Sequence, residues 1–412
     1  MQRHDHANEI WITGIGLVSS LGEGIEAHMN VLTGQRPCVP NVDETTFAPY
    51  PIHRLVPLTL GKQIPKNSDQ RQMEGWQRLG VYAAGLALED AGIKGCAELL
   101  DRTDLVVAAG SGERDTAVDC KVLEATGAVG NSPLRANEIL PSALRPTLFL
   151  AQLSNLLAGN ISIVHHVTGS SRTFMGEEMA GVAAIDNAFQ RIEAGQSEVC
   201  LVGGALNAER EDLLLAYELG RTLWHHPFQP IEQRASQGGG FVPGSVGAFL
   251  VIEERRHAEA RSARAYARLV AVEADRGCRK GDTAIDPLVR LLGRLEGVTA
   301  QGTAAVFSGT SGVAPATGAE LAFLNDLRAR GRIDYVWAYG NLLGHAVEAH
   351  FPAGIALAAL AQHGRRVSLG LVGEGADELS CVDRTIVTGV GLRRGEGVAV
   401  IEPVSEREPH GA

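Results

Sequence analysis

The stretch VVAAGSG at residues 106–112 returns, one residue longer, as AVFSGTSG at residues 305–312. In both copies a short apolar run typical of a strand ends in a turn of glycine with serine or threonine. Each half also closes on a similar strand, GAFLVIEE at 247–254 and GVAVIEP at 397–403. A spacing of about 200 residues predicts a duplicated α/β unit packed about a pseudo-twofold axis. A chance likeness between short glycine-ended strands is the alternative.

Around these turns, apolar strands alternate with helical patterns. Continuous Val, Ile and Leu strands between helices indicate sheets that are covered on both faces. The predicted halves span residues 9–255 and 256–405, with flexible tails at 1–8 and 406–412. We predict helices at 22–33, 78–91, 148–159, 180–194 and 287–295, and strands at 10–15, 104–109, 161–164, 199–203, 246–252, 267–272 and 304–307.

Composition excludes several classes of function. The 412 residues carry a net charge of −11 with no basic run longer than two residues, which argues against a nucleic-acid groove. Six scattered cysteines without a CxxC pair, and scattered histidines, predict no metal site. The polar start leads straight into a strand, and no apolar run reaches the roughly 20 residues of a membrane helix. We expect a cytoplasmic protein.

The order of motifs resembles the β-ketoacyl-acyl-carrier-protein synthases, a family with the thiolase fold. The likeness runs over nearly the whole chain, and it implies a thiolase-like fold with five layers in the order αβαβα. The segments that carry it are WITGIGLVSSLGEGIEAHMNVLTGQ at 11–35, NLLAGNISIVHHVTG at 155–169, CLVGGALNAE at 200–209, HPFQ at 226–229 and GGGFVPGSVGAFLVIEE at 238–254.

The resemblance also shows where the catalytic residues of the family would fall. The family uses a cysteine at a helix start, two histidines and a lysine, beside a gating loop rich in Phe and Gly. Counting from Gly169 and from Gly203 places Glu178 at the cysteine position. Ser308 stands at the first histidine, Gly340 at the lysine and His345 at the second histidine, while the gating loop reads VGLRR at 390–394.

One of the four catalytic side chains therefore remains, His345. A carboxylate is a poor acyl acceptor because the resulting anhydride hydrolyses readily, and Cys200, in a predicted core strand, is no substitute. We interpret Glu178 as a plug that pairs with His345 or with an arginine such as Arg172; a working role in decarboxylation is the alternative. Glu177 is expected to face outward or to cap the helix.

The resemblance implies a substrate pocket at Phe174, Met175, Gly340, Val390 and Leu392, and dimerisation through a strand at about 172–175. We predict a non-condensing, chain-length-factor-like subunit of fatty acid synthesis. Its partners would be an acyl carrier protein, which brings its own phosphopantetheine, and an active synthase as heterodimer partner, or a second copy. No cofactor of its own is expected. The GEE motif at residues 176–178 resembles the companion synthases of bacterial very-long-chain fatty acid systems that supply lipid A. Two alternatives stay open, a malonyl decarboxylase or hydrolase that uses Glu178 and His345, and a structural scaffold.

Overall fold

The computed structural model describes residues 9–127, 132–145, 148–278, 285–299, 302–364, 366–369, 377–380 and 382–404. The first half contributes five strands to the main sheet, in the spatial order β4-β3-β5-β6-β1. β3 runs parallel to β4 and to β5, and the last two strands are antiparallel to their neighbours. The bounds are β1 (Ile10–Ser19), β3 (Asp104–Ala109), β4 (Ser171–Met175), β5 (Val199–Leu206) and β6 (Val246–Glu254).

The second half repeats this order and these directions as β9-β8-β12-β13-β7. The two sets of strands join where β1 pairs with β7 over three residue pairs. This one-to-one correspondence confirms the predicted duplicated α/β architecture. The tails at 1–8 and 406–412 lie outside the described residues, and the boundary between 255 and 256 stays a prediction. The bounds are β7 (Ala267–Cys278), β8 (Ala304–Ser308), β9 (Tyr335–Ala338), β12 (Arg384–Val390) and β13 (Arg394–Glu402).

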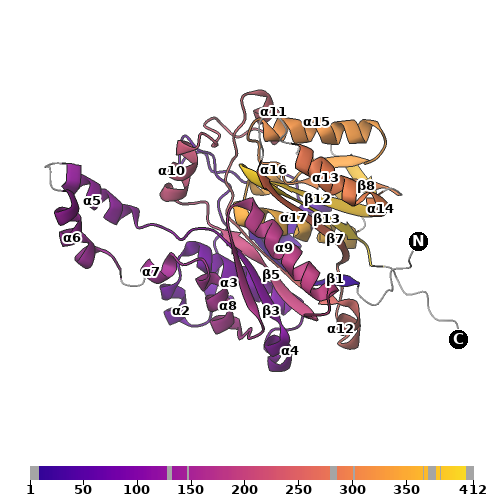
Figure 1. Cartoon of the computed structure of the whole chain (residues 1–412), viewed down its shortest axis with the longest axis horizontal. Helices are drawn as coiled ribbons and strands as arrows, with labels where there is room; N and C mark the ends of the chain where they lie inside the picture. Colours follow the sequence, from indigo (N-terminus) through magenta and orange to yellow (C-terminus); the bar gives the residue numbers. More distant parts are fainter. Residues whose placement is uncertain are drawn as a thin grey trace.

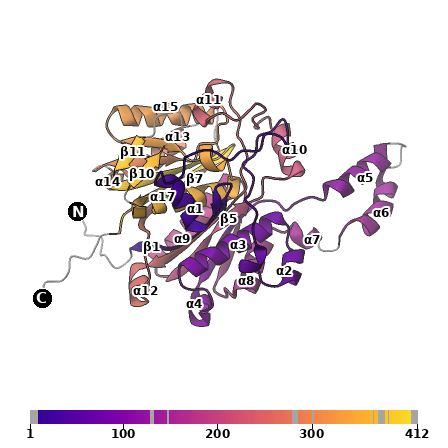
Figure 2. The ribbon, with the colours of Figure 1, turned by 180° about the vertical axis from the view of Figure 1, so that it is seen from behind.

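Five layers follow from where the helices bury their apolar faces. The helices α9 (Glu178–Glu193) and α17 (His350–Gly364) lie in the middle, and each contacts strands of both halves. α3 (Gly75–Asp90) and α8 (Leu156–His165) cover the outer face of the first half, while α13 (Asp286–Arg294) and α15 (Ala316–Ala329) cover the second (Figures 1 and 2). The buried apolar residues form one large central cluster and an outer cluster in each half, as five layers require.

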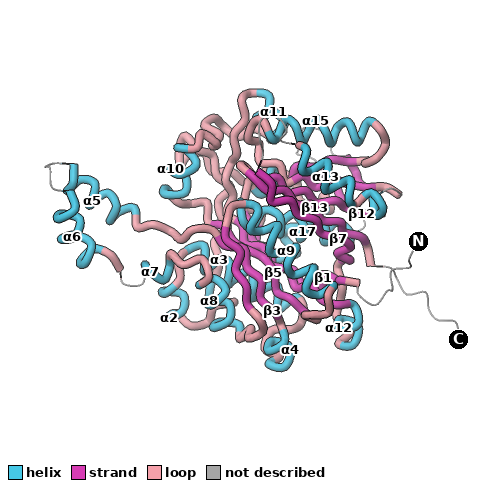
Figure 3. The backbone as a smooth tube through the Cα atoms, in the orientation of Figure 1, coloured by secondary structure: helices cyan, strands magenta, loops and turns pink. Residues whose placement is uncertain are grey.

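The remaining elements are shorter or lie at the periphery, and loops connect them around the sheet (Figure 3). None of the helices in the described residues is long and apolar enough to cross a membrane. The bounds are β2 (Gly22–Glu23), α1 (Gly24–Leu32), η2 (Leu60–Lys62), α2 (Asn67–Gln72), α4 (Ala97–Arg102), α5 (Thr116–Gly127), α6 (Ser132–Ala143), α7 (Leu148–Ala151), α10 (Glu211–Leu219), α11 (Ile231–Ser236), α12 (Arg255–Ala260), α14 (Glu296–Thr299), α16 (Gly340–Leu343), η3 (Val347–Ala349), β10 (Arg366–Leu369) and β11 (Asp377–Ser380).

The predicted strand at 161–164 is wrong, because these residues belong to the helix α8. The run ISIV is rich in β-branched residues, which favour strands when they stand alone. Here Leu157, Ala158 and Ile161 are buried at helical spacing, and α8 packs on α3. This packing on a neighbouring helix outweighs a local preference of a few tenths of a kcal/mol per residue. The strand comes later, as β4.

Candidate functional site

The site begins at the turn between β4 and α9. Gly176 has φ +144°, a conformation that side chains rarely adopt, and it lets the chain reverse from the strand into the helix. Glu177 then occupies the N-cap position without a side-chain cap hydrogen bond, and Glu178 is the first residue of the helix. A helix start carries partial positive charge, which favours an acidic side chain there. Glu178 nevertheless points into the protein, where it is 3% exposed.

His345 is the partner of Glu178. Its Nε2 lies 2.7 Å from Glu178 Oε1, and its imidazole is as deeply buried as the carboxylate. The backbone N–H of His345 donates to Val242 at 2.8 Å, which fixes the segment between α16 and η3. Glu178 Oε2 and His345 Nδ1 have no hydrogen-bond partner among the described residues. Of the two partners predicted for Glu178, the structure therefore selects His345; Arg172 is exposed and contacts Ser170 instead.

Ser308 does not join this pair. Its hydroxyl donates to Glu320 Oε1 at 2.8 Å, and the Thr388 hydroxyl donates to the same oxygen at the same distance. Ser308 also accepts a hydrogen bond from the Thr310 backbone N–H, within the turn that ends β8. In this structure the residue completes a buried turn.

His350, the first residue of α17, is a neighbour that sequence reasoning missed. Its ring centroid lies 4.4 Å from that of His345 and 4.5 Å from that of Tyr339. Burial, and the nearby His345, lower the pKa of His350 well below its usual range, so it is neutral at physiological pH. The sequence signal for His350 was its position five residues after His345. This spacing does not predict that the two rings are close, because their proximity depends on how the chain folds back at η3.

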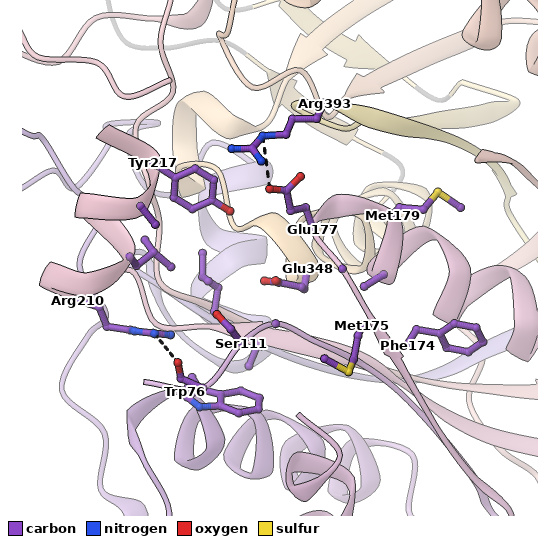
Figure 4. A pocket seen from close by; sticks show the side chains of 18 of the residues that line it. Trp76, Ser111, Phe174, Met175, Glu177, Met179, Arg210, Tyr217, Glu348 and Arg393 are labelled. Atoms are coloured by element: carbon purple, nitrogen blue, oxygen red, sulfur yellow. Dashed lines mark hydrogen bonds and ion pairs between the residues drawn. The ribbon is translucent and has the colours of Figure 1, made fainter. Parts of the chain in front are cut away.

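A cavity of about 1200 Å³ opens beside the start of α9. It lies at the carboxyl ends of the parallel strands β3, β4 and β5, which is where ligands bind in open α/β sheets. Figure 4 shows Phe174, Met175 and Met179 along one side and Arg210 and Trp76 along another. Among the described residues, no cysteine lines this cavity.

Two of the five predicted pocket residues, Phe174 and Met175, line this cavity. Gly340, Val390 and Leu392 are not among the residues that line it, so their part in a substrate pocket stays a prediction. Gly340 packs near Ile231, and the other two are turned toward separate apolar clusters beneath outer helices and loops. Residues of one turn or strand alternate between its two faces, and a sequence match alone does not say which face borders the cavity. The residues that sequence reasoning missed here are Tyr217 and Glu348.

Glu348 brings a second buried carboxyl group to the cavity. It lies on η3, is 6% exposed, and its Oε2 has no hydrogen-bond partner among the described residues. Burial first, and then the negative charge of Glu178, raise the pKa of Glu348 to about 8. Its only sequence signal was its position three residues after His345, within the same short segment.

Five arginines also line the cavity. Arg210 is held by Asp212 at 2.6 Å, and Arg393 lies 4.0 Å from Glu177. Arg276 and Arg394 also line the cavity, and within the described residues neither makes an ion pair with an acid at 4 Å or less. Burial raises the pKa of Glu177, and the Glu178 charge adds to this effect. The cavity thus joins an apolar wall to a cationic one. Within the described residues no group of three His, Cys, Asp or Glu side chains could hold a metal ion.

A model of the N-terminal domain of β-ketoacyl synthases matches residues 7–258. The chain belongs to the β-ketoacyl synthase family. Among curated β-ketoacyl synthases, 3-oxoacyl-[acyl-carrier-protein] synthase 2 of Vibrio harveyi is 27% identical over 267 residues, 63% of this chain and 61% of that protein. The enzyme of the same name from Rhizobium meliloti is 28% identical over 275 residues. The chain spans about three fifths of the length of these relatives.

Solved ketosynthase structures match over almost the full length. The ishigamide ketosynthase/chain length factor superposes with a TM-score of 0.78 at 19% identity, covering 97% of this chain and 100% of that one. A β-ketoacyl synthase from Burkholderia phymatum gives 0.75 at 18% identity over the same shares. The chain thus has the thiolase-like fold that its motifs predicted.

In this β-ketoacyl synthase homologue, the buried cysteine of the described residues, Cys200, is poorly suited to act as a nucleophile. Cys200 lies in the core strand β5 and is 0% exposed. Burial raises the pKa of its thiol to about 12, so the nucleophilic thiolate is scarce at neutral pH. Cys38, Cys96 and Cys120, which form no disulfide within the described residues, do not line the cavity either.

Proposed function

We propose that this protein is a non-condensing β-ketoacyl synthase homologue that acts as a chain-length-type subunit beside an active synthase. The observation that carries the proposal is Glu178. It occupies the first turn of α9, next to the cavity, and it is already hydrogen-bonded to His345. The motif spacing predicts that this position corresponds to the cysteine that accepts the acyl chain in the family.

The chemistry of the pair supports a structural role. An acyl group on a carboxylate would form an anhydride, which water hydrolyses, so Glu178 cannot carry a growing chain. Breaking the pair would leave a charged or polar group buried without a partner, which is costly. A decarboxylase or hydrolase built on Glu178 and His345 finds less support, because neither side chain lines the cavity where substrate would bind.

The partner surface is the exposed edge of β4. This strand ends the sheet, most of its residues are exposed or half-buried, and Met175 is 72% exposed. We propose that this edge pairs with the same strand of an active synthase, or of a second copy. An acidic acyl carrier protein would approach the arginine-lined side of the cavity, bringing its phosphopantetheine arm to Arg393 and Arg394. One solved neighbour is described as a type II polyketide acyl-carrier protein in complex with its ketosynthase.

The test is co-expression with candidate active synthases from the same genome, followed by co-purification and measurement of product chain length. We expect no condensation by the purified chain alone, and a changed product length when it is paired. The Glu178→Gln variant, which preserves shape and removes charge, serves as a control for the plug. Elongation by the isolated chain at rates typical of the family, or an acyl thioester on the polypeptide, would refute the proposal.

A further inference from the structure

Glu348 is packed into its position by three glycines. A Cβ atom on Gly110 would overlap the Glu348 carboxyl group, with 2.9 Å to its Cδ. Added Cβ atoms on Gly181 and Gly204 would approach the Glu348 backbone oxygen. The backbone of β3, β5 and α9 therefore comes close to η3 only because these residues lack side chains. Glu348 thereby lines the cavity (Figure 4), and its Oε2 atom, which is buried, has no hydrogen-bond partner among the described residues.

Tyr217 reaches the same cavity from α10, on the opposite wall. Figure 4 shows its hydroxyl directed toward the interior, on the side where Glu348 lies. Within the described residues this hydroxyl makes no hydrogen bond. Burial, and after it the negative charge of Glu348, raise the pKa of Tyr217. A tyrosine hydroxyl and a carboxyl group thus line one cavity, and the hydroxyl and one carboxyl oxygen have no hydrogen-bond partner among the described residues.

The charge state of Glu348 decides what it can bind. Glu178 and Glu177 from α9 face it and favour its neutral form, while Arg210 opposes them. His345 is engaged by Glu178, and His350 is neutral. β3, β5 and β6 also pack against η3, but their ionisable side chains, Asp104, Cys200, Glu253 and Glu254, lie at the far ends of the strands. With its pKa raised to about 8, the Glu348 carboxyl is largely protonated at neutral pH and donates a hydrogen bond.

We propose that the Glu348 carboxyl and the Tyr217 hydroxyl together bind a carbonyl oxygen of an acyl ligand in this cavity. Both groups act as donors, as a buried acid and a tyrosine can do when they face one oxygen. The rest of the wall is apolar and suits the hydrocarbon part of such a ligand; it includes Phe174, Met175, Met179, Ala180, Ala183 and Leu206. The acyl class rests on the proposed function, whereas the pair of donors stands on the geometry.

The experiment measures binding of two probes to the full chain by calorimetry. One is a 3-oxododecanoyl thioester of N-acetylcysteamine, and the other is the dodecyl thioether of N-acetylcysteamine, which lacks both acyl carbonyls. Tyr217→Phe and Glu348→Met each remove a donor at nearly constant volume. We expect each variant to bind the 3-oxoacyl probe about tenfold more weakly, and the thioether as tightly as the parent chain does.

Glu348→Gln and pH separate hydrogen bonding from shape. The glutamine amide still donates, so this variant should retain binding within about threefold and lose its pH dependence. The parent chain should bind the 3-oxoacyl probe progressively more weakly between pH 7 and pH 9, as Glu348 ionises. Tyr335→Phe, on β9 at the opposite end of the sheet from β4 and outside the cavity lining, serves as the matched control, and thermal unfolding of each variant verifies folding.

Equal losses for both probes in Glu348→Met and Tyr217→Phe would overturn the proposal, since they would indicate damage to shape. Unchanged binding of the 3-oxoacyl probe in both variants would overturn it as well. These outcomes are distinct from failure of the proposed function. A chain that binds the probe through both donors, but alters no partner's product, would retain this site and lose the chain-length role.

Discussion

At the residue scale, the Glu178–His345 contact joins two helical regions that are far apart in the sequence. Each group is buried, and each is the other's only hydrogen-bonded side-chain partner among the described residues. Such a pair contributes little net stability when intact, but it is costly to break, because the remaining partner loses both water and hydrogen bond.

Replacing Glu178 by alanine should therefore destabilise the fold. We expect a loss of about 1–3 kcal/mol in the free energy of unfolding, measured by urea denaturation. Glu177→Ala is the matched control, because that side chain is half-exposed and lies 4.0 Å from Arg393; its effect should stay below about 1 kcal/mol. Equal losses in both variants would contradict a special role for the buried pair.

Glu348 predicts a pH dependence of stability with a definite sign. Its pKa is raised from 4.5 to about 8 in the folded chain, so between these values the folded state binds more protons than the unfolded state. Stability should then fall as pH rises through this window, by up to a few kcal/mol, and level off above it. Urea denaturation at pH 5, 6, 7 and 8 measures this slope. In Glu348→Gln the slope should be shallower, and an unchanged slope would assign the loss to other groups.

At the scale of an element, two helical glycines offer a paired experiment. Gly181 lies in α9, where an added Cβ would collide with the Glu348 backbone and would lie 3.0 Å from Pro352 Cδ. Gly293 lies in α13, where an added Cβ would meet nothing within 4 Å. Both replacements gain helix propensity, and only the first suffers a clash.

Gly181→Ala should lower the free energy of unfolding by about 1–3 kcal/mol, because the clash between η3 and α9 cannot be relieved by a flexible side chain. Gly293→Ala should raise it by about 0.5–1 kcal/mol. Thermal or urea unfolding of the two variants side by side measures the difference. The same sign for both would mean that the contact between α9 and η3 is looser than the structure shows.

Most elements were predictable because their periodicity is strong, and the exceptions are instructive. The strands that end just before Gly110 and Gly309 indicated the duplication, and their positions in the two halves agree with it. The run at 161–164 misled, since its β-branched residues pack as a helix on α3. At the site, motif spacing found Glu178 and His345. It could not find Glu348 or Tyr217, because only the chain reversal at η3 and the approach of α10 bring them to one cavity.

At the scale of the whole molecule, no strand of the described residues pairs with the outer edge of β4, which lies at one end of an extended sheet. Open strand edges invite pairing with another chain. The pair α5 and α6 projects away from the body on the same side of the molecule as α7 (Figure 1), and carries the exposed Leu123 and Leu134. Such apolar side chains on an extended helix pair are consistent with a surface that another subunit covers.

Met175→Glu should weaken self-association, or association with a partner synthase, by at least about tenfold, because it places a charge on the exposed edge of β4. Light scattering coupled to size-exclusion chromatography measures the mass of each species. Val289→Glu, on α13 of the other half, is the control, since its side chain is similarly apolar and 42% exposed. An identical mass for Met175→Glu and the parent chain would locate the interface elsewhere.

The central layer has a consequence for whether the two halves can fold separately. Because α9 and α17 are each wedged between strands from both copies of the repeat, neither copy retains a complete interior when it is cut from the other. Cleavage of the chain between β6 and β7 would expose the apolar faces of α9 and α17. Each fragment should then aggregate unless the other fragment is present. The two halves should therefore unfold together, in one cooperative transition.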